Sequence, residues 1–200
     1  MSTDLFADRA TGWDAIGQRV ENVDHIARAM RGRLPFRESM ELMDFGSGTG
    51  LLAERIAPLV RKITAVDTSA AMNDQLARKR AAFDCELEIL EVDLLKTDLD
   101  RRFDGIISSM TLHHIEDIPS LFRRFHTLLE AGGFMALADL DTEDGSFHDD
   151  DTGVFHFGFD RDALVAMATD AGFDAPQTST AGIVRKPHRE FPVFLLTATR

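Results

Sequence analysis

Three glycines alternate with other residues between Asp44 and Gly50, where the sequence reads Asp-Phe-Gly-Ser-Gly-Thr-Gly. Glycine allows a sharp backbone turn, and its missing Cβ atom leaves room for a ligand against the main chain. Apolar residues precede this segment and resume at Leu51. We therefore expect a strand, a ligand-binding turn and a helix, in that order.

The spacing of these glycines separates two classes of ligand. In a dinucleotide-binding fingerprint the glycines follow the pattern G-x-G-x-x-G, and the N-terminus of the helix faces a pyrophosphate. Here Gly46, Gly48 and Gly50 follow the pattern G-x-G-x-G, and Leu51 takes the place of the third glycine of the fingerprint. An NAD-dependent oxidoreductase therefore fits this turn less well, and it stays open as an alternative.

Carboxylates end two further apolar runs. Asp67 follows the run 63–66, and Asp93 follows the run 87–92. A carboxylate at the end of the second strand of such a fold can accept hydrogen bonds from both ribose hydroxyls. NAD-binding folds share this feature, and an aspartate in this place can also simply cap the next helix. Asp67 thus indicates a ligand with a ribose without identifying it.

The order of these motifs resembles that of class I S-adenosylmethionine-dependent methyltransferases. The resemblance begins at Asp44 and continues through residues 103–109, Leu112-His113-His114 and residues 128–134, so that it spans roughly residues 10 to 175. It implies an enzyme that uses S-adenosylmethionine as cofactor, releases S-adenosylhomocysteine and methylates an unidentified small-molecule nucleophile. A non-catalytic S-adenosylmethionine-binding protein stays open as a second alternative.

The resemblance also implies which residues bind the cofactor. Asp44 would position the methionine amino group, Asp67 would hold the ribose, and Asp93 would receive the adenine amino group. Met72 would lie near the adenine, although it also fits the apolar stripe of its own helix. The full set is Asp44, Gly46, Ser47, Gly48, Gly50, Asp67, Thr68, Met72, Asp93, Leu94 and Ser109.

Two histidines are candidates for catalysis. Methyl transfer from a sulfonium is a displacement, which needs the two reactants held in line and needs no metal. A hydroxyl or ammonium acceptor must also lose a proton, and histidine is the usual proton acceptor near neutral pH. We therefore expect catalytic roles for His113, which follows the fourth apolar run, and for His156. Either histidine could instead only hydrogen-bond a nearby loop carbonyl.

The segment 139–160 is rich in acids and is expected to be a loop. Its carboxylates and histidines could ligate a divalent cation. However, the consecutive aspartates at 149–151 point in different directions and the histidines lack a recognised ligand spacing, so we expect no metal. Phe155, Phe157 and Phe159 alternate, so one face of this segment could line a substrate pocket.

Apolar periodicity predicts the elements that would position these residues. Steps of three and four from Trp13 to Met30 predict a helix. Helices should fill the gaps between short apolar runs, which predict strands at 41–45, 63–66, 87–92, 103–109 and 134–140. A later helix should end at Gly132-Gly133, and two closing strands should lie within 184–198.

With the resemblance, this pattern implies an α/β fold. The core would be a single doubly wound, mostly parallel seven-stranded sheet with helices on both faces and an antiparallel edge near the C-terminus. We expect one domain over residues 1–200, in which 1–35 form a helical cap or lid and 36–200 form the Rossmann-like core.

Composition limits the partners. A net charge of −12 counts against a nucleic-acid partner, because such binding depends on basic residues that neutralise phosphates. No apolar run approaches the roughly 20 residues that span a bilayer, so we expect no membrane association. The single cysteine gives no internal disulfide, which favours the cytoplasm. Nothing in the sequence identifies the acceptor or the oligomeric state.

Overall fold

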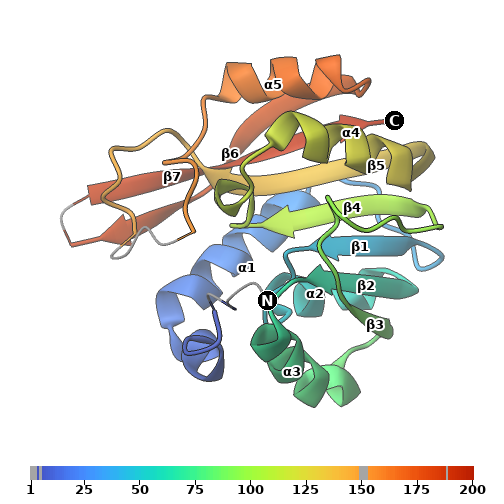
Figure 1. Cartoon of the computed structure of the whole chain (residues 1–200), viewed down its shortest axis with the longest axis horizontal. Helices are drawn as coiled ribbons and strands as arrows, with labels where there is room; N and C mark the ends of the chain where they lie inside the picture. Colours follow the sequence, from blue (N-terminus) through green and yellow to red (C-terminus); the bar gives the residue numbers. More distant parts are fainter. Residues whose placement is uncertain (1–3, 5, 149–152, 188) are drawn as a thin grey trace.

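The computed structural model describes residues 4, 6–148, 153–187 and 189–200. Within these residues, seven strands form one sheet: β1 (Glu41–Phe45), β2 (Lys62–Asp67), β3 (Glu86–Glu91), β4 (Phe103–Ser109), β5 (Leu129–Leu140), β6 (Asp174–Lys186) and β7 (Arg189–Thr199). Their order across the sheet is β3-β2-β1-β4-β5-β7-β6 (Figure 1).

Strands β1 to β5 run parallel, while β7 lies antiparallel between β5 and β6. The expected fold class is thereby confirmed. Strand β1 lies between β2 and β4, so the chain crosses to the other side of β1 after β3. At such a switch in strand order the connections at the carboxyl ends diverge and leave a crevice for a ligand. The switch falls at the glycine-rich turn that follows β1.

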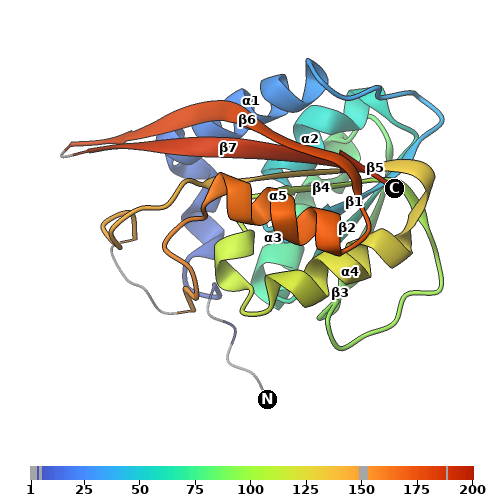
Figure 2. The ribbon, with the colours of Figure 1, turned by 90° about the horizontal axis from the view of Figure 1, so that it is seen from above.

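Helices cover both faces of the sheet (Figure 2). One face carries α1 and α2, with α3 packed beside them through Leu76, and the opposite face carries α4 and α5. Among the described residues, no helix is both long and apolar enough to cross a membrane. The helices are α1 (Gly17–Arg31), α2 (Leu51–Ile56), α3 (Ala70–Lys79), α4 (Ile118–Leu128) and α5 (Arg161–Asp170).

Strand β1 shows why strands of this sheet can be recognised in the sequence as apolar runs. Leu42 and Met43 are adjacent and both fully buried, and they belong to the cores on opposite faces of the sheet. A strand covered on both faces needs apolar residues at every position. Asp44 breaks this pattern, because it is only 1% exposed in the same strand. Burying a carboxylate costs free energy unless it is paired, so its position indicates a functional site.

The expected helix end at Gly132-Gly133 is wrong. Helix α4 ends at Leu128, and the next residue is already extended and pairs with Phe103 as the first residue of β5. The glycines lie inside β5, where the register shifts between the Phe103 and Gly105 pairs. Gly132 has a φ of +78°, and a Cβ atom on Gly133 would crowd the backbone of Asp104. The glycines therefore form an irregularity in β5.

Two other expectations differ from the structure. Strand β6 begins at Asp174, well before residue 184. The apolar pattern misses its first half because small polar residues fill this part of a partly exposed edge strand. No helix fills residues 92–102, all of which are described. This connection contains a turn in which Asp93 accepts a hydrogen bond from the backbone N–H of Leu95 (3.0 Å), and buried Leu94 anchors it to the core.

Candidate active site

The turn after β1 is built on three glycines in the left-handed backbone region. The φ angle is +65° at Gly46, +53° at Gly48 and +81° at Gly50, which other residues rarely adopt. A Cβ atom would collide with Thr111 if added at Gly46 and with Leu76 if added at Gly50, but the space in front of Gly48 is open. Gly48 therefore offers bare main chain to a ligand.

Three of the expected cofactor residues hold buried polar atoms without a hydrogen-bond partner. These atoms are Oδ2 of Asp44, Oγ of Ser47 and Oγ of Ser109. They belong to β1, to the glycine turn and to the end of β4, and β1 and β4 are neighbours in the sheet. Each such atom costs about 1–3 kcal/mol. Three of them at one edge of the sheet indicate a site whose ligand supplies the partners.

The carboxyl group of Asp44 is protonated more easily than an ordinary carboxyl group. Burial, together with the nearby charge of Asp67, raises the pKa of Asp44 to about 8, while a hydrogen bond from the backbone of Ala53 works in the opposite direction. A cationic ligand group beside Asp44 would favour the carboxylate and lower this pKa. The amino group of a methionine moiety has this chemistry.

Asp67 organises the turn as well as facing the site. Its Oδ2 accepts a hydrogen bond from the backbone N–H of Gly48, and its Oδ1 accepts one from Ser69, each at 2.8 Å. Burial raises the pKa of Asp67, although these bonds oppose the shift. Each carboxylate oxygen has a second lone pair, so Asp67 can hold the turn and still accept from ribose hydroxyls. Ser69 caps α3, because its Oγ accepts a hydrogen bond from the backbone N–H of Met72 at 3.2 Å.

The other expected cofactor residues follow β2 and β3 but have different surroundings. Thr68 is exposed, whereas Met72 is 2% exposed and lies outside both hydrophobic cores. Leu94 is equally buried but packs into the core beneath α4. The carboxylate of Asp93 is already engaged, since its Oδ2 lies 2.6 Å from Nζ of Lys96.

A buried histidine–aspartate pair lies at the ends of β4 and β5. Nδ1 of His113 lies 2.8 Å from Oδ1 of Asp139, and the two residues are 2% and 0% exposed. The backbone N–H groups of His113 and Leu140 also donate to this carboxylate, at 3.2 and 2.8 Å. Burial acts to raise the pKa of Asp139, but the charge of His113 and these hydrogen bonds hold it below its ordinary value. Asp139 therefore stays ionised and favours the proton of the imidazole on Nδ1, so in the neutral ring Nε2 of His113 is the acceptor nitrogen.

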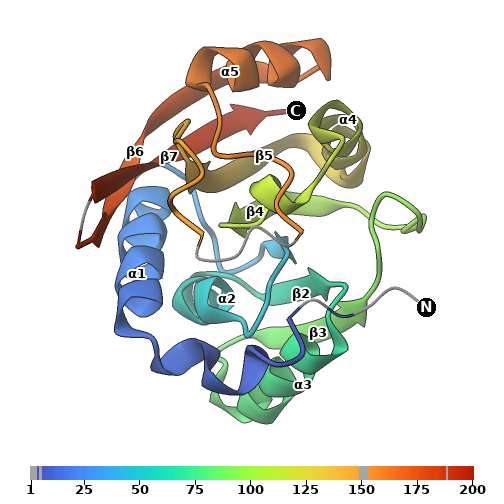
Figure 3. The same cartoon turned by 60° about the vertical axis from the view of Figure 1, so that its left-hand side comes forward.

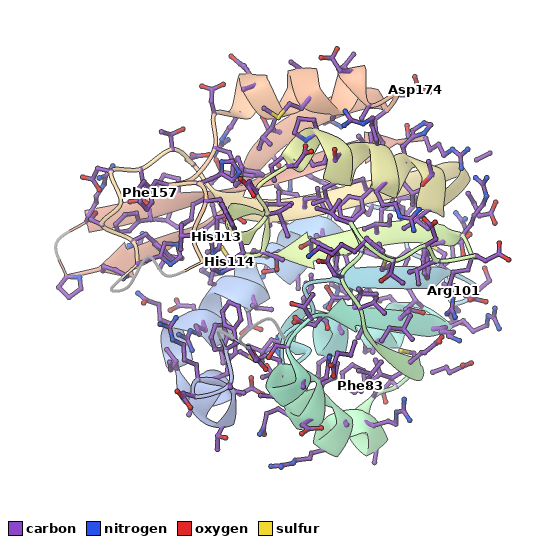
Figure 4. All side chains as sticks on the ribbon, in the orientation of Figure 1. Phe83, Arg101, His113, His114, Phe157 and Asp174 are labelled. Atoms are coloured by element: carbon purple, nitrogen blue, oxygen red, sulfur yellow. The ribbon has the colours of Figure 1, made fainter. Side chains whose placement is uncertain are left out.

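Two further histidines surround this pair. The ring of His114 lies 4.1 Å from that of His113, and the ring of His148 lies 4.8 Å from it. Figure 4 shows His113 and His114 next to each other beyond the end of β4. Burial, followed by the charge of His113, lowers the pKa of both His114 and His148 to about 4. Both rings are therefore neutral at pH 7.

His156 contacts the turn that carries His113 but does not join the pair. Its Nε2 lies 2.9 Å from the carbonyl oxygen of Ile115, and its backbone N–H donates to the carbonyl oxygen of His113 at 3.3 Å. These contacts hold the turn in place. Of the alternating phenylalanines, only Phe159 is buried, whereas Phe155 and Phe157 are 54% and 43% exposed.

Residues 10–15, which precede α1, lie beside α3 (Figure 3). The carboxylate of Asp4 accepts hydrogen bonds from Oγ of Ser69 (2.9 Å) and from the backbone N–H of Ala71 (3.3 Å). The ring of Phe6 lies 5.2 Å from the ring of His114. Asp4 therefore contacts the start of α3, and Phe6 contacts the histidines.

The acidic segment is only partly a loop. Asp139 and Leu140 are fully buried and belong to β5, so the expectation of a loop beginning at 139 is wrong there. The side chain of Asp139 is held by His113, which is why a carboxylate fits this buried position. Residues 149–151 lie outside the described part of the chain. In the described ranges, no three His, Cys, Asp or Glu residues are grouped in a way that could hold a metal ion.

Sequence reasoning assigns no role to Asp139 or to His148. The sequence does contain a signal for Asp139, because this aspartate comes near the end of the fifth apolar run, as Asp44 and Asp67 come near the ends of earlier runs. His148 has no comparable signal, because its position beside His113 depends on the path of the loop after β5.

The chain matches the family model described as a methyltransferase domain over residues 18–177. An uncharacterised methyltransferase of Schizosaccharomyces pombe is 30% identical over 138 residues, which cover 61% of this chain and 49% of the relative. The ubiquinone biosynthesis O-methyltransferase of Methylocella silvestris is 32% identical over 116 residues, which cover 55% of this chain and 43% of that protein. The chain thus spans about half the length of these curated relatives.

A solved structure has the same fold. Haemonchus contortus phosphoethanolamine N-methyltransferase 2, in complex with S-adenosyl-L-methionine, superposes with a TM-score of 0.75 and 17% sequence identity. The superposition covers 100% of this chain and 60% of that protein. At this identity the likeness concerns the fold alone.

Proposed function

The chain belongs to the methyltransferase domain family, and from this premise we propose that it transfers a methyl group from S-adenosylmethionine to a small-molecule nucleophile. The observation that carries this proposal is the set of unpartnered buried atoms on Asp44, Ser47 and Ser109. The family resemblance assigns Asp44 and Ser47 to the amino acid portion of the cofactor and Ser109 to its sulfonium end.

The residues around the turn fit that cofactor. We assign the methionine amino group to Oδ2 of Asp44, which is buried and has no partner. The open main chain at Gly48 would lie against the ligand, and Asp67 would accept hydrogen bonds from the ribose. Thr68 and Met72 would lie on the adenine side, with Asp93 and Leu94 at its edge. No phosphate is needed, and the acidic residues would repel one.

His113 is proposed as the proton acceptor. When bound, S-adenosylmethionine supplies a methyl carbon that the acceptor attacks, and the electron pair of the broken carbon–sulfur bond stays on sulfur. Nε2 of His113 takes the proton that a hydroxyl or ammonium acceptor loses, and Asp139 stabilises the resulting imidazolium through Nδ1. Asp139 is thus a positioning residue. His156 is proposed to act only by holding the turn of His113.

Two alternative functions fit the site less well. An NAD-dependent oxidoreductase needs the third fingerprint glycine, and its place is taken by Leu51, which is buried in the core. A non-catalytic binding protein would not need the buried His113–Asp139 pair, which costs free energy to keep. The net charge of −12 favours a small molecule over a nucleic acid.

Calorimetric titration with S-adenosylhomocysteine tests the proposal. We expect one-site binding to the folded wild-type protein, no binding of NAD, and weaker binding to Asp44→Asn. The matched control is Asp74→Asn, which changes an exposed carboxylate on α3. Absence of heat with S-adenosylhomocysteine and S-adenosylmethionine, on protein whose circular dichroism shows it to be folded, would exclude the proposed function.

A further inference from the structure

A cavity lies at the end of the sheet that faces away from the glycine turn. It is formed by the segment after α1, by early residues of β4, β5 and β6, and by the last residues of β7. Met40, which lines the cavity, precedes β1, whereas the glycine turn follows this strand. A strand rises about 3.3 Å per residue, so β1 separates the two places by roughly 16 Å. The cavity is therefore distinct from the candidate active site.

The cavity has room for a small organic molecule. Its volume is about 240 Å³. One water molecule takes about 30 Å³ in the liquid, so this space corresponds to roughly eight water molecules. Part of its wall is apolar, because Met40, Phe134 and Ala198 line it and are only 3%, 3% and 4% exposed. Such a wall favours a ligand with an apolar group.

Charged groups of both signs line the same cavity without pairing with one another. Among the described residues, the guanidinium group of Arg37 and the carboxylate of Glu130 have no hydrogen bond or ion pair. Arg33 donates one long hydrogen bond, from Nη1 to the carbonyl oxygen of Ala29 at 3.5 Å, and has no acidic partner in this part of the chain. These side chains are exposed, so they lie where the cavity opens to solvent.

The fourth charged residue of the cavity is already engaged. Oδ2 of Asp104 accepts a hydrogen bond from the backbone N–H of Glu41 at 2.8 Å. Two arginines and one carboxylate thus remain available to a ligand. A planar guanidinium group binds a carboxylate with two parallel hydrogen bonds, and a carboxylate accepts hydrogen bonds from an ammonium group.

The backbone around the cavity is irregular on two sides. Gly132 has a φ of +78° in β5, and the space in front of it is open. Ala175 has a φ of +46° in β6, where the register with β7 shifts between Asp174 and Gln177. Among the described residues other than glycine, only Met110, directly after β4 at the candidate active site, also has a positive φ. Such strain and such irregularities in strands cluster at functional sites.

We infer that this cavity binds a small zwitterion with an apolar side chain, which is the chemistry of an apolar α-amino acid. Arg33 and Arg37 bind its carboxylate, Glu130 binds its ammonium group, and the apolar side chain packs against Met40 and Phe134. A simple anion would meet the charge of Glu130, and a simple cation would meet two arginines. Only a ligand with both charges pairs with all the available groups.

Three compounds with the same branched side chain test the two charges. L-leucine carries both, 4-methylpentanoate lacks the ammonium group, and L-leucinamide lacks the carboxylate. We expect L-leucine to bind at least about tenfold more tightly than either analogue, because each analogue loses charge-assisted hydrogen bonds. Nitrogen–proton correlation spectra of the isotope-labelled protein measure the affinities. Signals of residues 33–40, 130–134 and 175–177 should shift, and those of residues 46–50 should not.

Substitutions at the mouth of the cavity assign each charge. Arg37→Gln and Glu130→Gln should each weaken binding of L-leucine by about tenfold. Glu130→Gln should also reduce the preference for L-leucine over 4-methylpentanoate, since this analogue has no ammonium group to lose. Arg31→Gln and Glu38→Gln are the matched controls, because both residues are exposed and neither lines the cavity.

Four results would overturn the inference. These are no shift with L-leucine, equal affinities for the three compounds, shifts confined to residues 46–50, and wild-type affinity for L-leucine in both Arg37→Gln and Glu130→Gln. None of these measurements involves cofactor binding or methyl transfer. Their failure would therefore count against this cavity as a binding site and leave the proposed function as it stands.

Discussion

The charge of Asp67 acts on the buried carboxyl group of Asp44 in the neighbouring strand and, with burial, raises the pKa of Asp44 to about 8. The two acids therefore resist being ionised together while the site holds no cation. A ligand that brings a positive charge to Asp44 removes this conflict. We therefore expect the pair to link binding of the proposed cofactor to proton release.

Binding of S-adenosylhomocysteine should release a proton from Asp44 at pH 7. The free protein holds this proton below about pH 8, and the ammonium group of the ligand favours the carboxylate. Affinity should therefore rise from pH 6 to pH 8 and level off above it. Calorimetry in phosphate and Tris buffers measures the proton release as a difference in heat. Equal heats in both buffers would show that Asp44 does not meet the amino group.

Replacing His113 with Ala should lower turnover by about 10²–10⁴-fold, the usual contribution of a general base, without changing the affinity for S-adenosylhomocysteine. Asp139→Asn should also lower turnover and should change how turnover depends on pH, because asparagine no longer keeps the proton on Nδ1 of His113. His126→Ala, on α4, is the matched control. Thermal melting confirms that each variant is folded. Unchanged turnover in His113→Ala would remove the pair from the mechanism.

Gly48→Ala should weaken S-adenosylhomocysteine binding by more than its effect on folding explains. The added methyl group meets no protein atom, so it would enter the space proposed for the ligand. The left-handed backbone costs about 1–2 kcal/mol for a residue with a Cβ atom. Gly132→Ala carries the same strain, with a φ of +78° and open space, at the opposite edge of the sheet. Equal loss of cofactor affinity in both variants would refute a contact at Gly48.

His114 and His148 should make the protein sensitive to mild acid. Their pKa is lowered to about 4 from the ordinary 6.5, so between these values the unfolded chain takes up protons that the folded chain does not. Their contribution to stability is complete above pH 6.5 and is lost as the pH falls towards 4. Asp44 and Asp67 have raised pKa values, so their contributions to stability change with pH in the opposite direction. The effect of the two histidines must therefore be measured by comparing a histidine variant with the wild-type protein.

The double variant His114→Gln, His148→Gln isolates this effect. Its free energy of unfolding in urea should fall less between pH 7 and pH 4.5 than that of the wild-type protein. Parallel changes in the two proteins across this range would show that the two histidines are not neutral in the folded state.

The sheet was predictable because most of its strands are covered on both faces. Residues of β1 and β4 are buried at nearly every position, so each strand stands out as an apolar run. The edge strand β6 is only partly buried, and its polar first half carries no such pattern. The irregularity at Gly132 could not be predicted, because a glycine pair that follows a helix can either end that helix or lie inside the next strand.

The residues proposed to bind the cofactor could be grouped from the sequence because they lie at the ends of strands or directly after them. Asp44, the glycine turn and Asp67 owe their positions to the parallel sheet. The acceptor side could not be placed in the same way. Phe6 contacts His114, and His148 contacts His113, only because of the paths of the chain before α1 and of the loop after β5.

A crystal structure of the complex with S-adenosylhomocysteine tests the central claim most directly. The account predicts the amino group within hydrogen-bond distance of Oδ2 of Asp44, about 3 Å, with the ribose at Asp67 and the sulfur turned towards His113. A ligand bound elsewhere, or with its sulfur turned away from His113 and its amino group away from Asp44, would contradict it.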